Sequence, residues 1–271
     1  LPVDNLGRVL PETLRRAFEK NPNDVALVTV MWANNEVGTV QPIAKLVKIA
    51  HEFKTVFHSD AVQAVGCLEV HFQNTDLDAM TVSGHKVGGP QGIGALVVKR
   101  DIELTPLLHG GGQERDVRSG TLAAPSIAGF AAATTTAVSQ SVSRAARLSS
   151  LRKDLVKRIQ EQIPDVVLNG DPENRLPGNA HFSFKGCEGD ALLMLLDAQG
   201  IECSTGSACS AGIPQPSHVL IAMGRDEITA RASLRFSFGA TSTPDDVDAV
   251  MQVLPAIVER AKRAGKPAVA K

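Results

Sequence analysis

The sequence predicts an α/β protein with a mostly parallel sheet, followed by a smaller C-terminal α+β domain. Residues 25–32 (VALVTVMW) form a continuous apolar run, which is typical of a strand buried on both faces of a sheet. Apolar residues at helical spacing and short strand-like runs then alternate as far as residue 99. Strands that alternate with helices indicate parallel crossover connections. A second domain is expected to begin within the helical stretch 125–162, and Pro and Gly residues from position 164 onwards mark a change in the character of the sequence.

The first domain begins with an amphipathic helix, expected at residues 10–20. A second helix is expected from apolar residues at helical spacing, which are Ile43, Leu46, Val47, Ala50 and Phe53. Residues 55–58, 77–82 and 95–99 are predicted strands. In a parallel sheet, ligands bind at the carboxyl ends of the strands. The sequence places three polar groups there: Asn34 and Asn35, Asp60, and residues 83–86.

The second half of the chain opens with residues 125–162, which contain few helix breakers and predict one long helix or a pair. Strands are then expected at 180–184 and 232–238, helices at 190–199 and 218–223, and a loop at 206–216. Thr243 as N-cap and Pro244 in the first turn begin a final helix that runs to about Arg263. We therefore expect residues 1–128 to belong to a large α/β domain and residues 129–271 to supply a linking helix and the small domain.

The composition excludes several classes of function. The chain has 271 residues, 43% of them hydrophobic, and a formal net charge of -1. Its basic residues are spread out, so no nucleic acid or anionic membrane surface is implied as a partner. The longest apolar runs are too short to span a bilayer, and the first residues lack the regions of a signal peptide. A cytoplasmic protein is therefore expected. Its four cysteines form no Cys-x-x-Cys pair and are too few for a disulfide framework in a chain of this length, so reduced thiols are expected.

The functional prediction depends on Lys86, which ends the polar turn Ser83-Gly84-His85-Lys86 between two apolar stretches. Asp60 ends a predicted strand 26 positions earlier, so an acid and an amine share one edge of the sheet. An isolated pair of this kind is most often an ion pair or a strand-end cap. The alternative is a pyridoxal phosphate site, in which the lysine forms a Schiff base and the aspartate keeps the pyridine nitrogen protonated.

Four motifs give the chain a family resemblance. SDAVQAVG at 59–66, SGHKVGGPQGIGAL at 83–96, GGGQERDVRSGT at 110–121 and STGSACS at 204–210 occur in the order and at the spacing of the cysteine desulfurases. These are class V enzymes of the fold-type I pyridoxal phosphate superfamily, and the similarity extends from about residue 25 to the final helix. The resemblance implies a pyridoxal 5'-phosphate cofactor, the transferase-type fold and a large cofactor-binding domain.

The resemblance also implies roles for individual residues. Lys86 would be the Schiff-base lysine, Asp60 the partner of the pyridinium and Gln63 the donor to the phenolic oxygen. The phosphate would be held by Ser83 and His85, and by Thr121 from the neighbouring subunit, which implies a homodimer. Asn35, which the resemblance also implies beside the cofactor, and Arg235 would bind the substrate carboxylate. The guanidinium of Arg235 suits that role because it can make two parallel hydrogen bonds to a carboxylate.

The resemblance implies removal of sulfur from L-cysteine, giving L-alanine and a persulfide on the enzyme. Cys209 is predicted to be the nucleophile, because it lies among small residues and matches the family motif. Cys203 is predicted to be structural, and Cys67 and Cys187 to be packing residues. The Cys-x5-Cys spacing, with His218 nine positions beyond Cys209, fits no common zinc site. The sulfur would go to an acceptor protein for iron-sulfur cluster assembly or thiolation.

The chain departs from the family pattern at its start. Family members carry an upstream phosphate loop and a histidine that stacks on the pyridine ring, and neither is found here. Together with the missing initiator Met, this predicts a truncated or processed product that binds its cofactor poorly or is inactive unless that segment is supplied. Two alternatives to a cysteine desulfurase stay open. One is a selenocysteine lyase, which uses the same lysine, aspartate and cysteine, and the other is a non-catalytic scaffold subunit of the same fold.

Overall fold

The computed structural model describes residues 1–205 and 215–264. The chain divides into two compact units. The lysine unit, which contains Lys86, consists of Pro11–Trp32 and Pro42–Val142. The arginine unit, which contains Arg235, consists of Leu1–Leu10, Ala33–Gln41 and Ser143–Lys271. Over the described ranges, no helix has the length and apolar character needed to cross a membrane.

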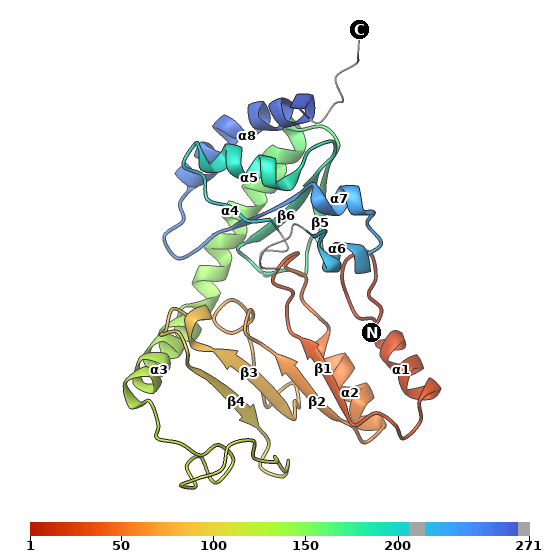
Figure 1. Ribbon diagram of the computed structural model, residues 1–271, viewed down its shortest axis with the longest axis vertical. Helices are drawn as coiled ribbons and strands as arrows, with labels where there is room; N and C mark the ends of the chain where they lie inside the picture. The colour runs from red at the N-terminus through yellow and green to blue at the C-terminus, as the bar shows by residue number, and fades with distance from the viewer. Residues whose placement is uncertain (206–214, 265–271) are drawn as a thin grey trace. The chain divides into compact units, whose positions relative to one another are not determined.

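The lysine unit is an α/β layer structure, as the sequence predicts (Figure 1). Its four strands lie in the order β1-β2-β3-β4, and their bounds are Leu27–Met31, Val56–Asp60, Ala79–Ser83 and Gly94–Val98. The β1–β2 and β2–β3 pairs are parallel, whereas β3 and β4 are antiparallel. The residues between β3 and β4 are too few for a parallel crossover. The prediction of a mostly parallel α/β sheet is therefore confirmed.

Helix α2 (Ile43–Glu52) buries the apolar face that its sequence spacing predicts, with Ile43, Leu46, Val47 and Ala50 all inaccessible or nearly so. Phe53, just after α2, stacks on Phe18 of α1 (Pro11–Lys20) at 4.5 Å between ring centroids. The prediction that residues 25–32 are buried on both faces is wrong in this structure. Burial alternates along β1, and Leu27 is 51% exposed, because no described element covers that side chain.

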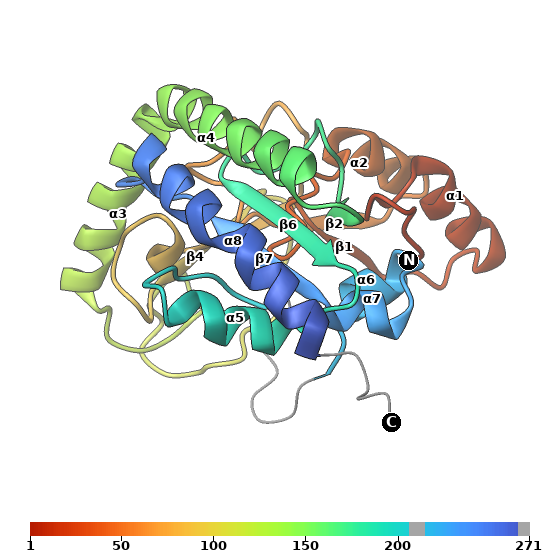
Figure 2. The same cartoon turned by 90° about the horizontal axis from the view of Figure 1, so that it is seen from above.

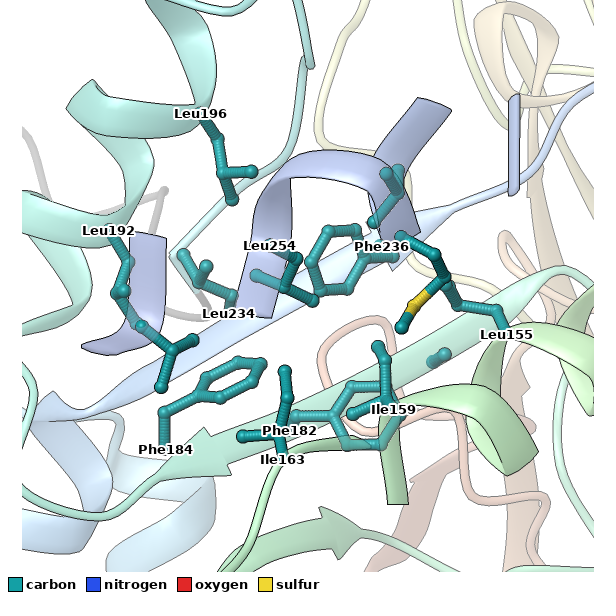
Figure 3. Close-up of a cluster of buried hydrophobic side chains, with 14 of the residues drawn as sticks. Leu155, Ile159, Ile163, Phe182, Phe184, Leu192, Leu196, Leu234, Phe236 and Leu254 are labelled. Carbon is teal, nitrogen blue, oxygen red and sulfur yellow. The ribbon is translucent and has the colours of Figure 1, made fainter. Parts of the chain in front are cut away.

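The arginine unit is α+β. Its antiparallel sheet has the order β5-β6-β7, with bounds Val166–Asn169, Asn179–Phe184 and Ser233–Ser237. Three helices supply apolar side chains to one face of this sheet: α4 (Ser141–Gln162), α5 (Gly189–Asp197) and α8 (Pro244–Ala264) (Figure 2). Phe182, Phe236, Leu192 and Leu254 meet in the core between them (Figure 3). Burial of such large apolar groups is the main stabilising contribution to this unit.

Two elements were not predicted. Strand β5 is only four residues long, and α7 (Glu227–Arg231) is a single short helix whose N-cap, Asp226, accepts a hydrogen bond from the Thr229 amide. The predicted stretch 125–162 is a pair of helices, α3 (Ala124–Ser139) and α4, interrupted at Gln140. Helix α6 (His218–Ala222) lies where the sequence predicts it. The domain boundary at residues 128 and 129 stays a prediction.

Asp78 is the centre of a polar network at the start of β3. Its carboxylate accepts hydrogen bonds from the Phe57 amide (2.7 Å) and His51 Nε2 (2.8 Å), and Lys99 Nζ lies 3.0 Å away. Asp78 is only 6% exposed. Burial alone would raise the pKa of Asp78, but the bonds from His51, Phe57 and Lys99 lower it below its ordinary value. The folded protein therefore favours the ionised carboxylate.

We expect Asp78→Asn to lower the free energy of unfolding at pH 7 by about 1–3 kcal/mol, since it removes charge-assisted hydrogen bonds from a buried site. Because the pKa of Asp78 is depressed by folding, its contribution is present above about pH 4 and is lost as the pH falls through the folded-state pKa. Urea unfolding between pH 3 and pH 7, a range set by the ordinary pKa of aspartate, should show a shallower pH dependence in the variant.

Asp76→Asn is the matched control, because Asp76 shares Lys99 and His51 but its side chain is 69% exposed. An exposed ion pair contributes about 0–1 kcal/mol. Equal losses of stability in the two variants would contradict the role given to the buried carboxylate.

Candidate active site

The carboxyl ends of β2 and β3 lie at the same edge of the sheet in the lysine unit. The two strands are parallel neighbours, and Asp60, the last residue of β2, is in register with Thr81 of β3. Ser83 ends β3, and the short helix η1 (Gly84–Lys86) follows at once. The structure therefore brings the predicted acid and the predicted amine to one sheet edge, as alternating strands and helices require.

Gly84 makes the turn before Lys86 possible. A Cβ at this position would lie 2.7 Å from Ile93 Cγ2 and 2.8 Å from the Pro90 carbonyl oxygen, so no larger residue fits without a shift. The Gly84 amide donates to the Ile93 carbonyl and the Gly89 amide donates to the Gly84 carbonyl, which closes the turn on both sides. The position of Lys86 is thus fixed by backbone packing.

The polar side chains of this turn face outwards. Ser83 Oγ and His85 Nδ1 are 2.8 Å apart, and both His85 and Lys86 are exposed. Among the described residues, the Lys86 amine has no hydrogen-bond or ion-pair partner. The exposed amine is therefore available to a ligand.

Asp60 and Gln63 lie half-buried beside this edge. Asp60 Oδ1 accepts a hydrogen bond from the Val62 amide (2.9 Å), which orients the carboxylate. His58, on the same face of β2, is 2.7 Å from Thr29 Oγ1. Burial lowers the pKa of His58, although the charge of Asp60 opposes the shift. The group beside Asp60 is therefore a neutral imidazole near pH 7, and the charge of Asp60 is left for a ligand.

Thr121 is exposed in the segment between β4 and α3. Three consecutive non-glycine residues of this segment, Glu114, Arg115 and Asp116, have φ between 52° and 64°. A left-handed backbone costs roughly 1–2 kcal/mol per residue. The Gly120 amide donates to Gln113 Oε1 (2.9 Å) and steadies the chain next to Thr121.

Arg235 lies on β7 in the arginine unit, where it is half-buried. Its Nη1 donates to the Asn35 carbonyl oxygen (2.9 Å), and its backbone pairs with Ser204 on the neighbouring segment. Arg235 Nε is buried and has no hydrogen-bond partner within the described ranges. An unpaired buried donor is costly, and a carboxylate is the anion that a guanidinium binds best in a two-bond geometry.

Sequence reasoning missed the polar face of β6 behind Arg235. His181 is in register with Arg235 and is fully buried, and Asn169 Nδ2 lies 3.2 Å from its Nδ1. Burial lowers the pKa of His181 to about 3, and the charges of Arg175 and Arg235 add to the shift. The signal that could have revealed this face is the period of two in Asn179, His181 and Ser183.

Glu36 is a second residue that sequence reasoning missed. It is 4% exposed and accepts a hydrogen bond from Ser217 Oγ (2.5 Å). Burial raises the pKa of Glu36, while the hydrogen bond from Ser217 and the charges of His218 and Arg235 oppose the rise. The positive charge of Arg235 therefore acts on Glu36. Glu36 is also the next residue after Asn35 in the sequence.

The thiols of Cys187 and Cys203 are poor nucleophiles. Cys203 packs against the apolar core of the arginine unit, and burial raises its pKa to about 11, with a further contribution from Asp197. Burial also raises the pKa of Cys187, whose Sγ lies 3.7 Å from the Val258 carbonyl oxygen. Cys209 lies outside the described residues. Residues 1–205 and 215–264 contain no group of three His, Cys, Asp or Glu that could hold a metal ion.

Comparison with known proteins places these features in a family. The aminotransferase class-V family matches residues 1–250. An "IscS-like cysteine desulfurase" of Mycobacterium tuberculosis is 58% identical over 265 residues, which is 97% of this chain and 67% of that protein. The "Cysteine desulfurase IscS" of Dictyoglomus turgidum is 42% identical over 260 residues, 96% of this chain and 65% of that protein. The chain thus spans about two thirds of the length of these relatives.

The fold is also similar to solved structures. A "NifS-like protein" from Rickettsia africae has a TM-score of 0.87 and 32% sequence identity, over 96% of this chain and 69% of that one. A second structure described as a "NIFS-like protein" has a TM-score of 0.86 and 34% identity, over 96% of this chain and 67% of that one. These likenesses confirm the predicted fold class.

We expect Cys203 to be almost unreactive towards iodoacetamide at pH 8, because with a pKa of about 11 only roughly one thiol in a thousand is ionised. Its rate of alkylation should rise about tenfold per pH unit up to pH 10. Peptide mapping by mass spectrometry would follow Cys203 separately from the other thiols. The urea-unfolded chain is the control, and equal rates in the folded and unfolded chain at pH 8 would show that burial does not suppress the thiolate.

Proposed function

Because the chain belongs to the aminotransferase class-V family, we propose that it carries pyridoxal 5'-phosphate on Lys86 and acts as a cysteine desulfurase. In this reaction L-cysteine loses its sulfur and L-alanine is released. The observation that carries the proposal is the unpaired amine of Lys86 on a turn that only glycine at position 84 permits, at the same sheet edge as Asp60. The similarity to the two cysteine desulfurases supports it.

The residues of the lysine unit fit this cofactor. Lys86 would bind its aldehyde carbon covalently, and the charge of Asp60 would hold a proton on the pyridine nitrogen. Gln63 would donate to the phenolic oxygen. Ser83 and His85 present a hydroxyl and an imidazole in contact with each other, which suits a phosphate. The bound group supplies an electron sink that weakens the bonds at the substrate's reacting carbons.

Arg235 and Asn35 would fix the substrate by its carboxylate. Arg235 is already oriented by the Asn35 carbonyl oxygen, and its buried Nε still needs an acceptor. A carboxylate at this position would satisfy that donor. Because His181 behind it is neutral, Arg235 would supply the positive charge for the substrate without a second cation on that strand pair.

Cys209 would receive the sulfur. Its thiolate would attack the sulfur of the bound substrate, so that a new S–S bond forms on Cys209 as the bond between that sulfur and the substrate's β carbon breaks. The electron pair of the broken bond stays with the organic product, which takes up protons and leaves as L-alanine. Cys203 is a weaker candidate, because burial keeps its thiol protonated.

The partners are part of the same proposal. The substrate is L-cysteine, and Thr121 would reach the phosphate bound by the other subunit of a homodimer. The persulfide sulfur would pass to an acceptor protein for iron-sulfur cluster assembly or thiolation. A cytoplasmic location stays a prediction from the sequence.

The first test is Lys86→Ala in the whole protein. Loss of the amine should abolish the visible absorption of the bound cofactor after gel filtration and reduce alanine release from cysteine by at least about 1000-fold, since nucleophilic catalysis is lost. Absorption spectra and amino-acid analysis measure the two effects. Lys99→Ala is the control, because Lys99 pairs with Asp76 and Asp78 away from the turn. A wild-type protein without colour in the presence of cofactor would favour the scaffold alternative.

The second test is Cys209→Ser. The variant should keep the cofactor absorption but lose the sulfur that intact-mass spectrometry finds on the wild-type protein after exposure to cysteine. Cys203→Ser should retain that added sulfur, because the thiol of Cys203 is half-buried and its raised pKa keeps it protonated. Sulfur on Cys203 in the Cys209→Ser variant would move the nucleophilic role to Cys203. Activity with selenocysteine and none with cysteine would favour the selenocysteine lyase.

A further inference from the structure

A cavity of about 530 Å³ lies in the arginine unit, between helix α4 and residues 168–175. All of its lining residues belong to this unit. A volume of roughly 300–1,000 Å³ is typical of small-molecule sites. Among the described residues, none of those proposed to hold the cofactor or the substrate carboxylate lines the cavity. It therefore has no part in the proposed reaction.

The lining of this cavity is predominantly positive. It contains four basic and two acidic side chains, which are Arg152, Lys153, Lys157, Arg175, Glu161 and Glu173. Lys157 Nζ is 3.9 Å from Glu161 Oε1, and both side chains are largely exposed, so this ion pair contributes little. The excess of two positive charges favours an anionic ligand.

Arg152 is the strongest anion-binding group of the cavity. The residue is only 5% exposed. Within the described ranges, its guanidinium donates one hydrogen bond, from Nη1 to the Leu176 carbonyl oxygen (3.0 Å), and forms no ion pair. A buried guanidinium with unused donors is costly. An anion in the cavity would accept hydrogen bonds from the donors of Arg152 that remain.

Arg175 adds positive charge to the same wall but has no nitrogen to spare. Its Nε, Nη1 and Nη2 all donate to oxygens within the protein. Burial lowers the pKa of Arg175 to about 10, and the charge of Arg152 adds to the shift, so the two guanidiniums repel each other. Asp171 opposes this effect, but its carboxylate already accepts from Arg8 and from the Glu173 amide. An anion between the guanidiniums would relieve their repulsion.

The rest of the wall is apolar. Val156 of α4, Leu168 of β5 and Pro172 line the cavity. Val156 and Leu168 are half-buried and also pack against the core of the arginine unit. A ligand that carries an organic group beside its anion would cover these side chains and gain the free energy of apolar burial.

We propose that this cavity binds a small organic phosphate. The phosphate would accept hydrogen bonds from Arg152 and Lys153, and the organic part would lie against the apolar wall. A phosphate monoester suits the site better than a carboxylate, because it carries nearly two negative charges at neutral pH and the lining has an excess of two positive ones. The site is separate from Ser83 and His85, which belong to the lysine unit.

The first experiment measures the binding of 1-naphthyl phosphate to the whole protein as purified, by isothermal titration calorimetry. Its affinity should be at least about tenfold higher than that of inorganic phosphate or of uncharged 1-naphthol, since both the anion and the apolar group contribute. Lys153→Ala should weaken binding by about three- to tenfold, and Arg152→Gln by about tenfold or more, because charge-assisted hydrogen bonds are lost. Lys185→Ala is the matched control, because Lys185 is exposed in the same unit but does not line the cavity. It should bind as the wild type does.

A second measurement locates the ligand without any variant. Lysines of the wild-type protein are acetylated with and without 1-naphthyl phosphate, and peptide mapping by mass spectrometry gives the rate at each position. The ligand should slow acetylation of Lys153 and Lys157 and leave that of Lys185 unchanged. Should Arg152→Gln fail to fold, Lys153→Ala and this protection decide.

Wild-type affinity in both cavity variants would overturn the inference, and so would a lack of saturable binding at millimolar concentrations. Equal affinities for inorganic phosphate and 1-naphthyl phosphate would contradict an organic ligand. Tighter binding of a phosphoserine peptide would indicate a protein partner and overturn the assignment to a small molecule. If Lys153 resists acetylation without ligand, the cavity is closed in the whole protein and the inference fails.

These outcomes are independent of the proposed function, because none of them depends on Lys86 or on alanine release. A wild-type protein that binds 1-naphthyl phosphate in the cavity but releases no alanine would overturn the proposed function alone. Alanine release with no such binding would overturn only the inference about the cavity.

Discussion

The architecture of the arginine unit depends on the hydrogen bonds that the buried guanidinium of Arg175 donates. It is 5% exposed, and it donates to backbone oxygens of four residues, Val37, Asn169, Asp171 and Asn179. Burial lowers the pKa of Arg175 to about 10, helped by the charge of Arg152, so the side chain stays charged at neutral pH. A buried charge persists only where it is fully hydrogen-bonded. The bond to the Val37 carbonyl oxygen attaches residues 33–41 to the segments around β5 and β6.

The attachment of residues 33–41 to the sheet determines where Asn35 and Glu36 lie. Residues 33–41 belong to the same compact unit as β5, β6 and β7, although they are separated from them by more than a hundred positions in the sequence. Asn35 and Glu36 thereby come next to Arg235 and Ser217. The lysine unit needs no such attachment, because parallel strands bring Asp60 and Lys86 to one edge by topology alone. The proposed reaction uses residues placed by the attachment of residues 33–41 and residues placed by the parallel strand ends.

These two arrangements differ in how well the sequence predicts them. Strand ends at Asp60 and Ser83 could be predicted because apolar periodicity is local. The bond between Glu36 and Ser217 could not, because a hydrogen bond between residues 181 positions apart leaves no periodic signal. Strand β5 was too short to stand out from its surroundings, and Arg175 resembles any surface arginine in sequence. The role of Cys209 is predicted from the sequence motif alone, because Cys209 lies outside the described residues.

The neutral state of His181 has a consequence for how the chain would respond to its surroundings. An imidazole of ordinary pKa beside Arg235, which we propose to bind the substrate carboxylate, would gain charge between pH 7 and pH 6 and alter the affinity of that arginine for anions. With a pKa of about 3, this ring stays uncharged throughout the range in which living cells operate. Binding of an anion by Arg235, as proposed, would therefore not vary with the charge of this ring.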